Sequence, residues 1–372
     1  MTDKPKERAA TTTDAQTLAP ASEADTQAPT VTYSMSPGLV AFLDSQNIAI
    51  AATSYQSGRL YLLSRNPQGG LMLNEQIFDK AMGLSVEGNT ILMATLANIY
   101  RLENVLRPGE WMDETYTHCY IPRTAHLTGV LDAHDVGLNK DGDTLFVNTR
   151  YNCIARVSDV HSFAPVWRPP FISKLVAEDR CHLNGMAISE GELRYVTAVS
   201  KSDTIDGWRD RTTDGGVVID VQENRIVCEG LSMPHSPRMH NGKLWVLNSG
   251  CGELGWVEPA SGENPGTFHA VAFCPGFVRG LSFYGSFAFV GLSKPRYERF
   301  EGLALDEKLK EADSEPWCGV QVIDLNKGSC VHWFRIDGAV AEMYDVDVVP
   351  GVMCAQSLGF ATNQPLGLIT IE

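Results

Sequence analysis

The sequence predicts an all-β fold, a six-bladed β-propeller closed by pairing of its C-terminal strand with its first blade. From about Ile48 onward, short apolar runs alternate with Gly, Asn and Asp turns. These runs repeat at roughly forty to fifty residues, which is the period of propeller blades. The last repeat is incomplete where the chain ends, and the first lacks an inner strand. Each can therefore complete the other, and the ring then has no exposed edge.

Each blade is expected to begin its inner strand with one of six aligned tetrapeptides. These are KAMG at Lys80, HDVG at His134, HLNG at His182, HSPR at His235, FVRG at Phe277 and MYDV at Met343. Apolar residues, a turn and a second strand follow each one. Turns at Asp141-Gly142, Glu190-Gly191 and Asn241-Gly242 have the composition of hairpin turns. The segments IAIAATSY, GRLYLLSR and LMLNEQIF form three strands of the first blade, and MYDVDVVPG supplies its fourth.

The remaining segments complete the expected organisation. Helices are predicted at SPGLVAFLDSQ and LALDEKLKEA. If GLVAFLD were a strand instead, the propeller would have seven blades. Residues 1–33, which are rich in Thr, Ala, Pro and acids, are expected to form a disordered tail without the apolar core of a secretory signal. Residues 34–372 then form a single propeller domain.

Composition excludes several classes of function. The formal net charge of −15 argues against nucleic-acid binding, which needs a basic surface. There is no run of eighteen apolar residues to span a membrane and no glycine-rich nucleotide-binding loop. The nine cysteines lack a CxxC pair and lie in apolar text, so we expect reduced thiols and a cytoplasmic protein. The oligomeric state is left open.

The first and third residues of each tetrapeptide are expected to face the channel, because side chains alternate along a strand. The first positions hold Lys80, His134, His182, His235, Phe277 and Met343, and the third hold Met82, Val136, Asn184, Pro237, Arg279 and Asp345. Three histidines from consecutive blades would then meet at one level. Three imidazoles can hold one divalent transition metal, namely zinc, iron or copper, and leave a position open for substrate.

Other channel residues complete the predicted site. Arg279 would hold a carboxylate or an oxyanion, and Asp345 or Tyr344 would transfer protons. Asn184 is expected beside them. Two alternatives remain: the histidines only bind waters and carbonyl groups, or calcium binds at Asn184 and Asp345, where oxygen ligands are too few.

Long loops are expected to overhang the histidine end of the channel. They are Lys201–Asp214, Lys294–Trp317, YIPRTAHLTGVLDA and WRPPFISKLVAEDR. Candidate contacts are Trp208, Arg209, Arg211, Arg168, Arg296 and Tyr297, which favour an anionic or peptide-like ligand. Among the other histidines, His118 and His126 could reach the channel mouth, whereas His161, His240, His269 and His332 are expected in turns or outer strands. Whether Lys201–Asp214 and Lys294–Trp317 move as a lid is left open.

Four segments, RPPFISKLVAEDRCHLNGMA, GLSMPHSPRMHNGKLWVLNSG, PGFVRGL and MYDVDVVPG, resemble a bacterial family of conserved hypothetical proteins, a domain of unknown function. CHLNGMAISEGELRYVT is similar to the inner hairpin of gluconolactonase-like propellers, whose Asn binds a divalent metal and matches Asn184; the other ligands of that family have no clear match. The histidine channel more distantly resembles peptidyl-hydroxyglycine amidating lyase, a six-bladed propeller with His-bound zinc. That resemblance implies metal ligation by His134, His182 and His235, with Arg279 and Tyr344 near the substrate.

These observations favour a metal-dependent enzyme that acts on a small-molecule or peptide substrate at the channel mouth by hydrolysis, elimination or oxidation. One alternative is a propeller that binds a ligand or protein without catalysis. Another is a calcium-dependent hydrolase like the lactonases.

Overall fold

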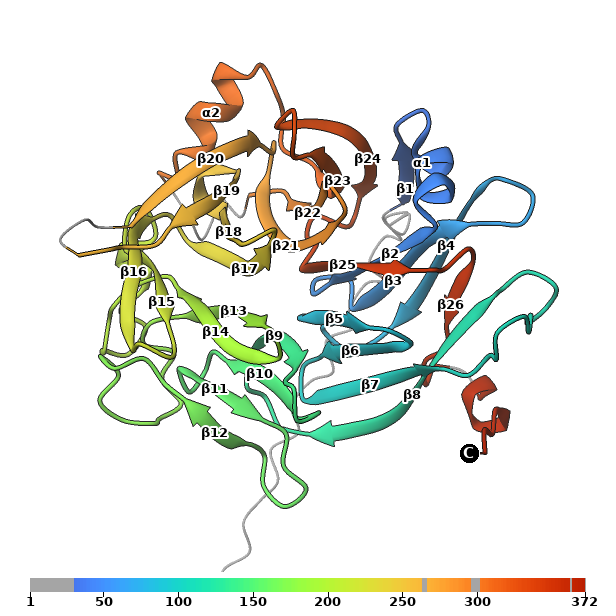
Figure 1. The fold of residues 1–372 in the computed structure, drawn as a ribbon, viewed down its shortest axis with the longest axis horizontal. Coiled ribbons are helices and arrows are strands. Elements are labelled where there is room, and N and C mark those ends of the chain that lie inside the picture. Colours follow the sequence, from blue (N-terminus) through green and yellow to red (C-terminus); the bar gives the residue numbers. More distant parts are fainter. Residues whose placement is uncertain (1–29, 263–265, 296–301, 362, 372) are drawn as a thin grey trace, which may run out of the picture.

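Six sheets surround a central channel in the computed structural model (Figure 1), which describes residues 30–262, 266–295, 302–361 and 363–371. The six-bladed prediction is thereby confirmed. Blade one contains β25 (Asp345–Pro350), β2 (Ile48–Ser54), β3 (Arg59–Arg65) and β4 (Leu71–Ile77). Blade two contains β5 (Leu84–Glu87), β6 (Thr90–Ala94), β7 (Asn98–Asn104) and β8 (His118–Leu127), with β26 (Ala355–Ser357) parallel to β8.

The other four blades follow in chain order around the ring. Blade three has β9 (Ala133–Leu138), β10 (Thr144–Asn148), β11 (Cys153–Arg156) and β12 (Ala164–Trp167), and blade four has β13 (Leu183–Ser189), β14 (Glu192–Ala198), β15 (Gly216–Asp220) and β16 (Arg225–Leu231). Blade five has β17 (Pro234–His240), β18 (Lys243–Asn248), β19 (Glu253–Glu258) and β20 (Thr267–Phe273). Blade six has β21 (Phe277–Tyr284), β22 (Phe287–Ser293), β23 (Cys318–Asp324) and β24 (Ser329–Gly338), extended by β1 (Val31–Met35).

The ring closes between the two ends of the propeller, as the sequence predicts. Strand β25 pairs with β2 in antiparallel register, from Ile48 opposite Pro350 to Thr53 opposite Asp345. All seven residues of β2 are buried, which explains why this strand reads as a continuous apolar run. The pairing satisfies the backbone groups that an open array would leave exposed.

Both predicted helices are present. They are α1 (Leu39–Gln46) and α2 (Leu305–Glu311), and three short 3-10 turns span Arg209–Arg211, Ser249–Cys251 and Gln364–Gly367. Because the GLVAFLD segment belongs to α1, it adds no seventh blade. None of the described helices is long and apolar enough to cross a membrane.

The predicted tail needs a shorter boundary than residues 1–33. Its first 29 residues lie outside the described part of the chain. Residues 31–33 begin β1, which pairs with β24. The Tyr33 ring stacks on Phe334 at 5.9 Å between centroids, and its hydroxyl donates to Glu75 at 2.6 Å. β-branched Val31 and Thr32 precede this aromatic anchor, a composition that favours a strand.

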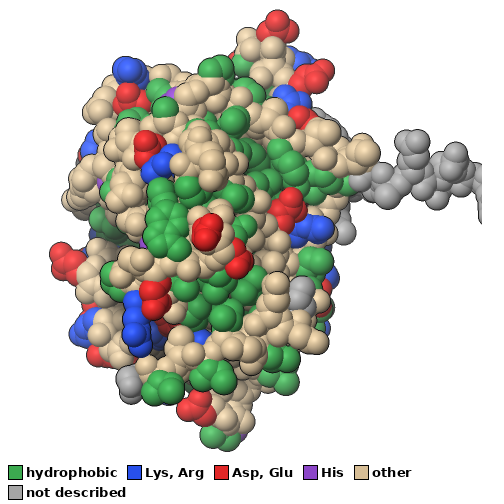
Figure 2. All heavy atoms as spheres, turned by 90° about the vertical axis from the view of Figure 1, so that its right-hand side faces the viewer, with side chains coloured by type: hydrophobic (Ala, Val, Ile, Leu, Met, Phe, Trp, Pro, Cys, Tyr) green, Lys and Arg blue, Asp and Glu red, His purple; other side chains and the backbone are tan. Residues whose placement is uncertain are grey.

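One side of the propeller exposes apolar groups. Figure 2 shows hydrophobic side chains on the side that carries β26, β8 and the C-terminal segment in Figure 1. The C-terminal segment contributes Phe360, Leu366, Ile369 and Ile371, all more than half exposed. This side lies on the outer rim and does not form the channel.

Candidate functional site

The three aligned histidines reach the channel from three consecutive blades. His134 lies on β9, His182 immediately precedes β13, and His235 lies on β17. All three are buried, with exposed fractions of 7%, 8% and 3%. Their backbones are irregular: His182 has a φ of 51°, and both β13 and β17 change register within their first residues. These irregularities direct the three side chains toward the channel, although in a regular strand successive side chains would alternate between its two faces.

A continuous series of contacts surrounds this level of the channel. The rings of His134 and His182 lie edge to face, 4.9 Å between centroids, and the Tyr344 ring is 5.5 Å from His134. The Arg279 guanidinium lies 5.2 Å from the Tyr344 ring and 5.1 Å from the Phe277 ring. Phe277 in turn contacts the His235 ring at 5.7 Å. The structure therefore brings five of the seven predicted site residues into this series, and Asn184 joins it through His235.

The Nδ1 atoms of His134 and His235 are held in the same way. Nδ1 of His134 lies 2.9 Å from the carbonyl oxygen of Asp132, and Nδ1 of His235 lies 2.8 Å from that of Met233. A carbonyl oxygen only accepts, so both Nδ1 atoms carry the proton. Hydroxyls of Thr149 and Ser249 lie 2.8 Å and 3.0 Å from the same nitrogens. The neutral rings therefore present an unprotonated Nε2.

Burial keeps both rings neutral. Desolvation lowers the pKa of His134 to about 4, opposed by the Asp132 carboxylate, while His182 adds to the lowering. Desolvation, the Arg279 charge and the other two histidines together hold the pKa of His235 well below its usual value. Neutral imidazole is the form that binds metals and accepts protons.

His182 has a different partner, a carboxylate. Its Nδ1 lies 2.8 Å from Oδ2 of Asp179, and the indole Nε1–H of Trp208 donates to the same oxygen at 3.0 Å. The Trp208 ring also stacks on the imidazole at 4.1 Å. Burial raises the pKa of Asp179, but the charge and hydrogen bond of His182 outweigh it, so the net pKa is lowered. Asp179 therefore stays ionised and orients His182.

Asn184 lies beside His235 and is itself oriented by a neighbouring strand. Its Nδ2 is 3.3 Å from Nε2 of His235, and its Oδ1 accepts a hydrogen bond from Thr197 at 2.8 Å. The Thr197 bond fixes which end of the amide faces the histidine. Asn184 therefore donates to the unprotonated nitrogen of His235.

Asp345 takes a different position from the one expected from strand alternation. Its carboxylate accepts the backbone N–H of Leu84 at 2.8 Å and lies 4.0 Å from Arg238. Arg238 also binds Asp135 in bidentate fashion, at 2.8 and 3.2 Å. Asp345 thus belongs to a carboxylate–guanidinium cluster, whereas the preceding residue, Tyr344, contacts His134.

The other aligned positions do not all line one level. Met343 is buried in the core between blades one and six, and Met82 and Val136 pack between blades two and three. Pro237 contacts Gly185 of the neighbouring inner strand. Left-handed backbone at Lys80, Ser236 and Gly280 interrupts the alternation, so a fixed two-residue period misplaces these side chains.

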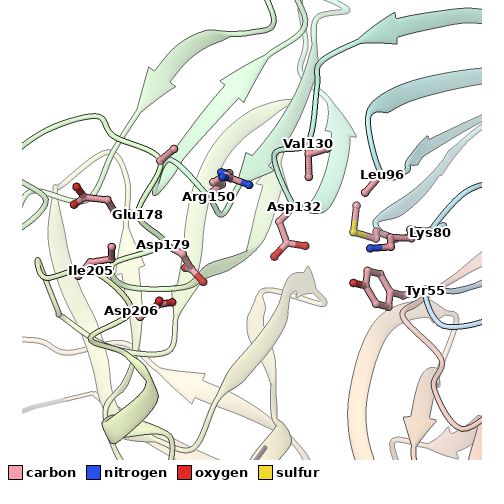
Figure 3. Close-up of a pocket in the computed structure, with 12 residues that line it drawn as sticks. Tyr55, Lys80, Leu96, Val130, Asp132, Arg150, Glu178, Asp179, Ile205 and Asp206 are labelled. Carbon is pink, nitrogen blue, oxygen red and sulfur yellow. The ribbon is translucent and has the colours of Figure 1, made fainter. Parts of the chain in front are cut away.

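A cavity of about 350 Å³ opens beside the histidines. Figure 3 shows Tyr55, Lys80, Asp132 and Asp179 directed toward it, with Val130 and Ile205 on its walls. The Tyr55 ring lies 6.0 Å from the Tyr344 ring, which joins the cavity to the histidine level. Side chains of both charges line the cavity, because Arg150, Glu178 and Asp206 also contribute to its wall.

The predicted loops contribute unequally. Trp208 is buried over His182, while Arg209, Arg211 and Arg168 are exposed, and Arg296 and Tyr297 lie outside the described residues. His118 and His126, expected in a connection near the mouth, instead lie on outer strand β8. This expectation was wrong because YIPRTAHLTGVLDA, whose Pro122 and Thr128 suggest a loop, begins with strand residues.

The hydrogen bonds of the histidines and the spacing of their rings give different indications about a metal site. Imidazoles with Nδ1 bound to carbonyl or carboxylate oxygens are typical of metal ligands. In the described part of the chain, however, no group of three ligating side chains is close enough to hold an ion. His134 and His182 are close, whereas Nε2 of His235 is bound to Asn184. The donor types fit a transition metal, and the assembled site would require His235 to exchange this hydrogen bond.

Sequence reasoning missed the residues that orient the histidines. Asp179 stands three residues before His182, and Trp208 lies in an insertion. Thr149 and Ser249 follow Asn148 and Asn248 at the ends of second strands, so a hydroxyl recurs at one position in two blades. This repeated Asn-Thr/Ser pair is the signal that could have identified them.

Comparisons with known proteins agree with the fold. The nidogen/laminin complex structure shares 13% identity, covering 82% of this chain and 99% of that one, with a TM-score of 0.52. Virginiamycin B lyase from Staphylococcus aureus shares 12% over 82% and 99%, with a TM-score of 0.40. A gluconolactonase from Xanthomonas campestris shares 11% over 80% and 87%, with a TM-score of 0.46. The likeness to the nidogen/laminin structure, whose TM-score is above 0.5, is a likeness of fold, and at this identity it says nothing about activity.

Among curated proteins, no sequence matches this one. One family model matches residues 37–358, which is nearly the whole propeller. The match includes all six tetrapeptides and the residues that orient the histidines. The chain therefore belongs to the family described as Domain of unknown function (DUF4915).

Proposed function

We propose that the protein is a metal-dependent enzyme whose site is the histidine end of the channel. It acts on a small anionic or peptide-like substrate by hydrolysis, elimination or oxidation. The observation that carries this proposal is that a protein acceptor holds Nδ1 in each of the three histidines. Such bonds fix the ring and direct Nε2 away from the protein, as metal ligands require.

The proposed roles follow from the contacts. His134, His182 and His235 would hold one divalent transition metal, zinc, iron or copper, through Nε2. The metal would supply a Lewis acid or an acidified water. Tyr344 lies against His134 and Arg279, where its hydroxyl can hold or move a proton. Asn184, whose Nδ2 now contacts Nε2 of His235, would give up this bond to the metal and bind substrate.

A second candidate is acid–base catalysis without a metal. It is favoured by the absence, among the described residues, of an assembled three-ligand group and by the Asp179–His182 pair. Nε2 of His182 would take a proton from the substrate and return it to the leaving group, while ionised Asp179 stabilises the imidazolium. Trp208 holds both partners in place.

The test is elemental analysis of untagged protein purified without chelator. Wild type, His182→Ala and a control, His161→Ala, are compared; His161 is exposed in a bend between β11 and β12. About one metal ion per chain in wild type and control, lost in His182→Ala, is the expected result. No metal in any sample, or full metal in His182→Ala, would overturn the metal proposal.

The second candidate has its own test. Metal-free protein is screened on small esters, lactones and β-substituted carboxylic acids. Turnover that survives chelation and disappears in His182→Ala would establish acid–base catalysis. Binding of the same compounds without turnover would instead indicate a binding propeller.

We propose the cytoplasm as the compartment. All nine cysteines, each within the described residues, have free thiols, and most are buried. This arrangement is typical of proteins from reducing compartments. The substrate is proposed to enter at the channel mouth, with no role for nucleic acid or membrane, and the negative net charge supports the exclusion of nucleic acid.

A further inference from the structure

Arg279 is a buried cation that forms no ion pair within the described part of the chain. Its side chain lies on β21 at the histidine level, and the residue is 8% exposed. Its Nε has no hydrogen-bond partner among the residues that the structure describes. Across the described residues, no carboxylate oxygen lies within the 4.0 Å of an ion pair with it, in contrast to Arg238 and Arg180. Buried charges in proteins are normally paired, so this guanidinium is poised for an external anion.

The surroundings of Arg279 do not supply that anion. The Phe277 and Tyr344 rings lie 5.1 and 5.2 Å from the guanidinium carbon, so the charge faces the electrons of two aromatic rings. His134 and His235 are neutral, as shown above. Burial lowers the pKa of Arg279, against the opposing effects of Tyr344, Asp132 and Tyr55. An arginine nevertheless stays protonated in proteins, so the site holds one positive charge that forms no direct ion pair within the described residues.

The charge of the site selects the kind of anion. A single guanidinium balances a monoanion, and its planar fork matches the two oxygens of a carboxylate. A dianion would leave one negative charge unbalanced at this buried level. The adjoining cavity would add repulsion that grows with the charge of the anion, because Asp132 and Asp179 line it (Figure 3). Both facts disfavour a phosphate group at Arg279.

We propose that Arg279 is the receptor for the carboxylate of a small monocarboxylic acid, whose remaining atoms extend past Tyr344 and Tyr55 into the 350 Å³ cavity. This inference rests on the proposed function, because it names the substrate class of the same site. The bound acid would follow the contact between the Tyr344 and Tyr55 rings into the cavity. Nζ of Lys80 lies 5.2 Å from the centre of the Tyr55 ring along this path. The polar side chains in the cavity wall, such as Asp132 and Lys80, suit a hydroxylated acid.

The test uses chelator-treated full-length protein with lactate, its neutral isostere lactamide, and inorganic phosphate as probes. Lactate is expected to raise the melting temperature and to bind saturably by titration calorimetry, at least about tenfold more tightly than lactamide or phosphate. Arg279→Met is expected to abolish lactate binding. It is also expected to raise the melting temperature of the ligand-free protein, since it removes an uncompensated buried charge.

Two further variants complete the design. Arg101→Met removes an exposed arginine that pairs with Glu103, and it should leave lactate binding unchanged. Arg279→Lys keeps the charge but loses the planar guanidinium fork, so lactate should bind at least about tenfold more weakly. This variant replaces Arg279→Met in the test if Arg279→Met fails to fold. Tighter binding of phosphate than of lactate, lactate binding retained in Arg279→Met, or a lower ligand-free melting temperature in that variant would each overturn the inference. Because the protein is treated with chelator before the test, carboxylate binding is measured without metal. Failure of this inference and failure of the metal proposal can therefore be distinguished.

Discussion

At the scale of single residues, the environment of each histidine decides its protonation. His134 and His235 donate Nδ1–H to backbone carbonyl groups, whereas His182 donates to the Asp179 carboxylate. The first two rings are neutral by burial, and the third faces a permanent negative charge. Three side chains at one repeat position therefore have two chemical roles.

The His134 ring makes stability depend on pH. Its pKa is about 4 in the folded protein against 6.5 in the unfolded chain, so only the unfolded chain takes up this proton between those values. The resulting stability is fully present above pH 6.5 and is lost as the pH falls toward 4. It amounts to on the order of 3 kcal/mol. Replacing His134 with Asn, which keeps a donor for the Asp132 carbonyl, should flatten this dependence.

Urea unfolding at about pH 4.5 and about pH 7 measures this pH dependence of the free energy of unfolding. The difference in free energy of unfolding between the two pH values should be smaller in His134→Asn than in wild type. Equal differences in the two proteins would show that His134 is not the titrating group.

Trp208 is expected to tune Asp179. In Trp208→Phe the ring stack on His182 is kept and the indole N–H bond is lost. The free energy of unfolding should fall by about 1 kcal/mol. The pKa of Asp179 should rise, because one of the hydrogen bonds that stabilise its charged form is gone. A carboxyl NMR titration measures this shift, and half-exposed Trp111→Phe is the control, for which no change is expected.

At the scale of elements, the two long insertions are held together by apolar packing. Trp208, from the loop after β14, packs with Leu305 and Leu309 of α2. Helix α2 has only seven residues, too few for a stable isolated helix, so its position depends on this packing. Lys308 of α2 also forms an ion pair with Glu253.

Leu309→Ala tests this packing. Leu309 is 5% exposed, so truncation should reduce the free energy of unfolding by about 2–5 kcal/mol. Near-ultraviolet circular dichroism should also change, because Trp208 loses a neighbour. Leu366→Ala, at a residue that is 71% exposed, should change neither. A loss of stability no greater than that of the control would mean that α2 does not hold the insertion.

Elements were predictable where composition fixes them. The turns at Glu190-Gly191 and Asn241-Gly242 have positive φ at both residues, as their sequences indicate. Helices α1 and α2 and the β25–β2 closure were likewise predicted. Channel orientation was only partly predictable. The left-handed backbone at His182 and Ser236 shifts the alternation, and Asp345 faces Arg238 instead of the histidines. Such shifts depend on contacts between blades, which a local period cannot contain.

At the scale of the whole molecule, charged side chains join the inner strands. Asp135 of β9 accepts the N–H of Met186 on β13, and Asp345 of β25 accepts that of Leu84 on β5. Arg238 of β17 lies between the two carboxylates. Burial and the neighbouring Asp135 raise the pKa of Asp345, and Arg238 opposes both. One guanidinium thus contacts carboxylates from blades on both sides of the channel.

Arg238→Met should weaken the entire ring. The substitution keeps most of the volume but leaves Asp135 and Asp345 without their cation, which costs about 3–5 kcal/mol when a buried pair is broken. Chemical unfolding should show one transition at lower denaturant. Arg225→Met, which removes an exposed pair with Glu223, should cost less than about 1 kcal/mol. Equal effects of the two variants would contradict a central role for Arg238.

The pairing of β25 with β2 also determines when the first blade can be completed during synthesis. The ribosome releases β2, β3 and β4 first, yet their sheet lacks an inner strand until residues 345–350 emerge. Through most of translation the nascent chain therefore carries an open apolar edge on its earliest sheet. Such edges recruit other strands, so this interval is when chaperones matter most. The first blade to be synthesised is the last to be completed.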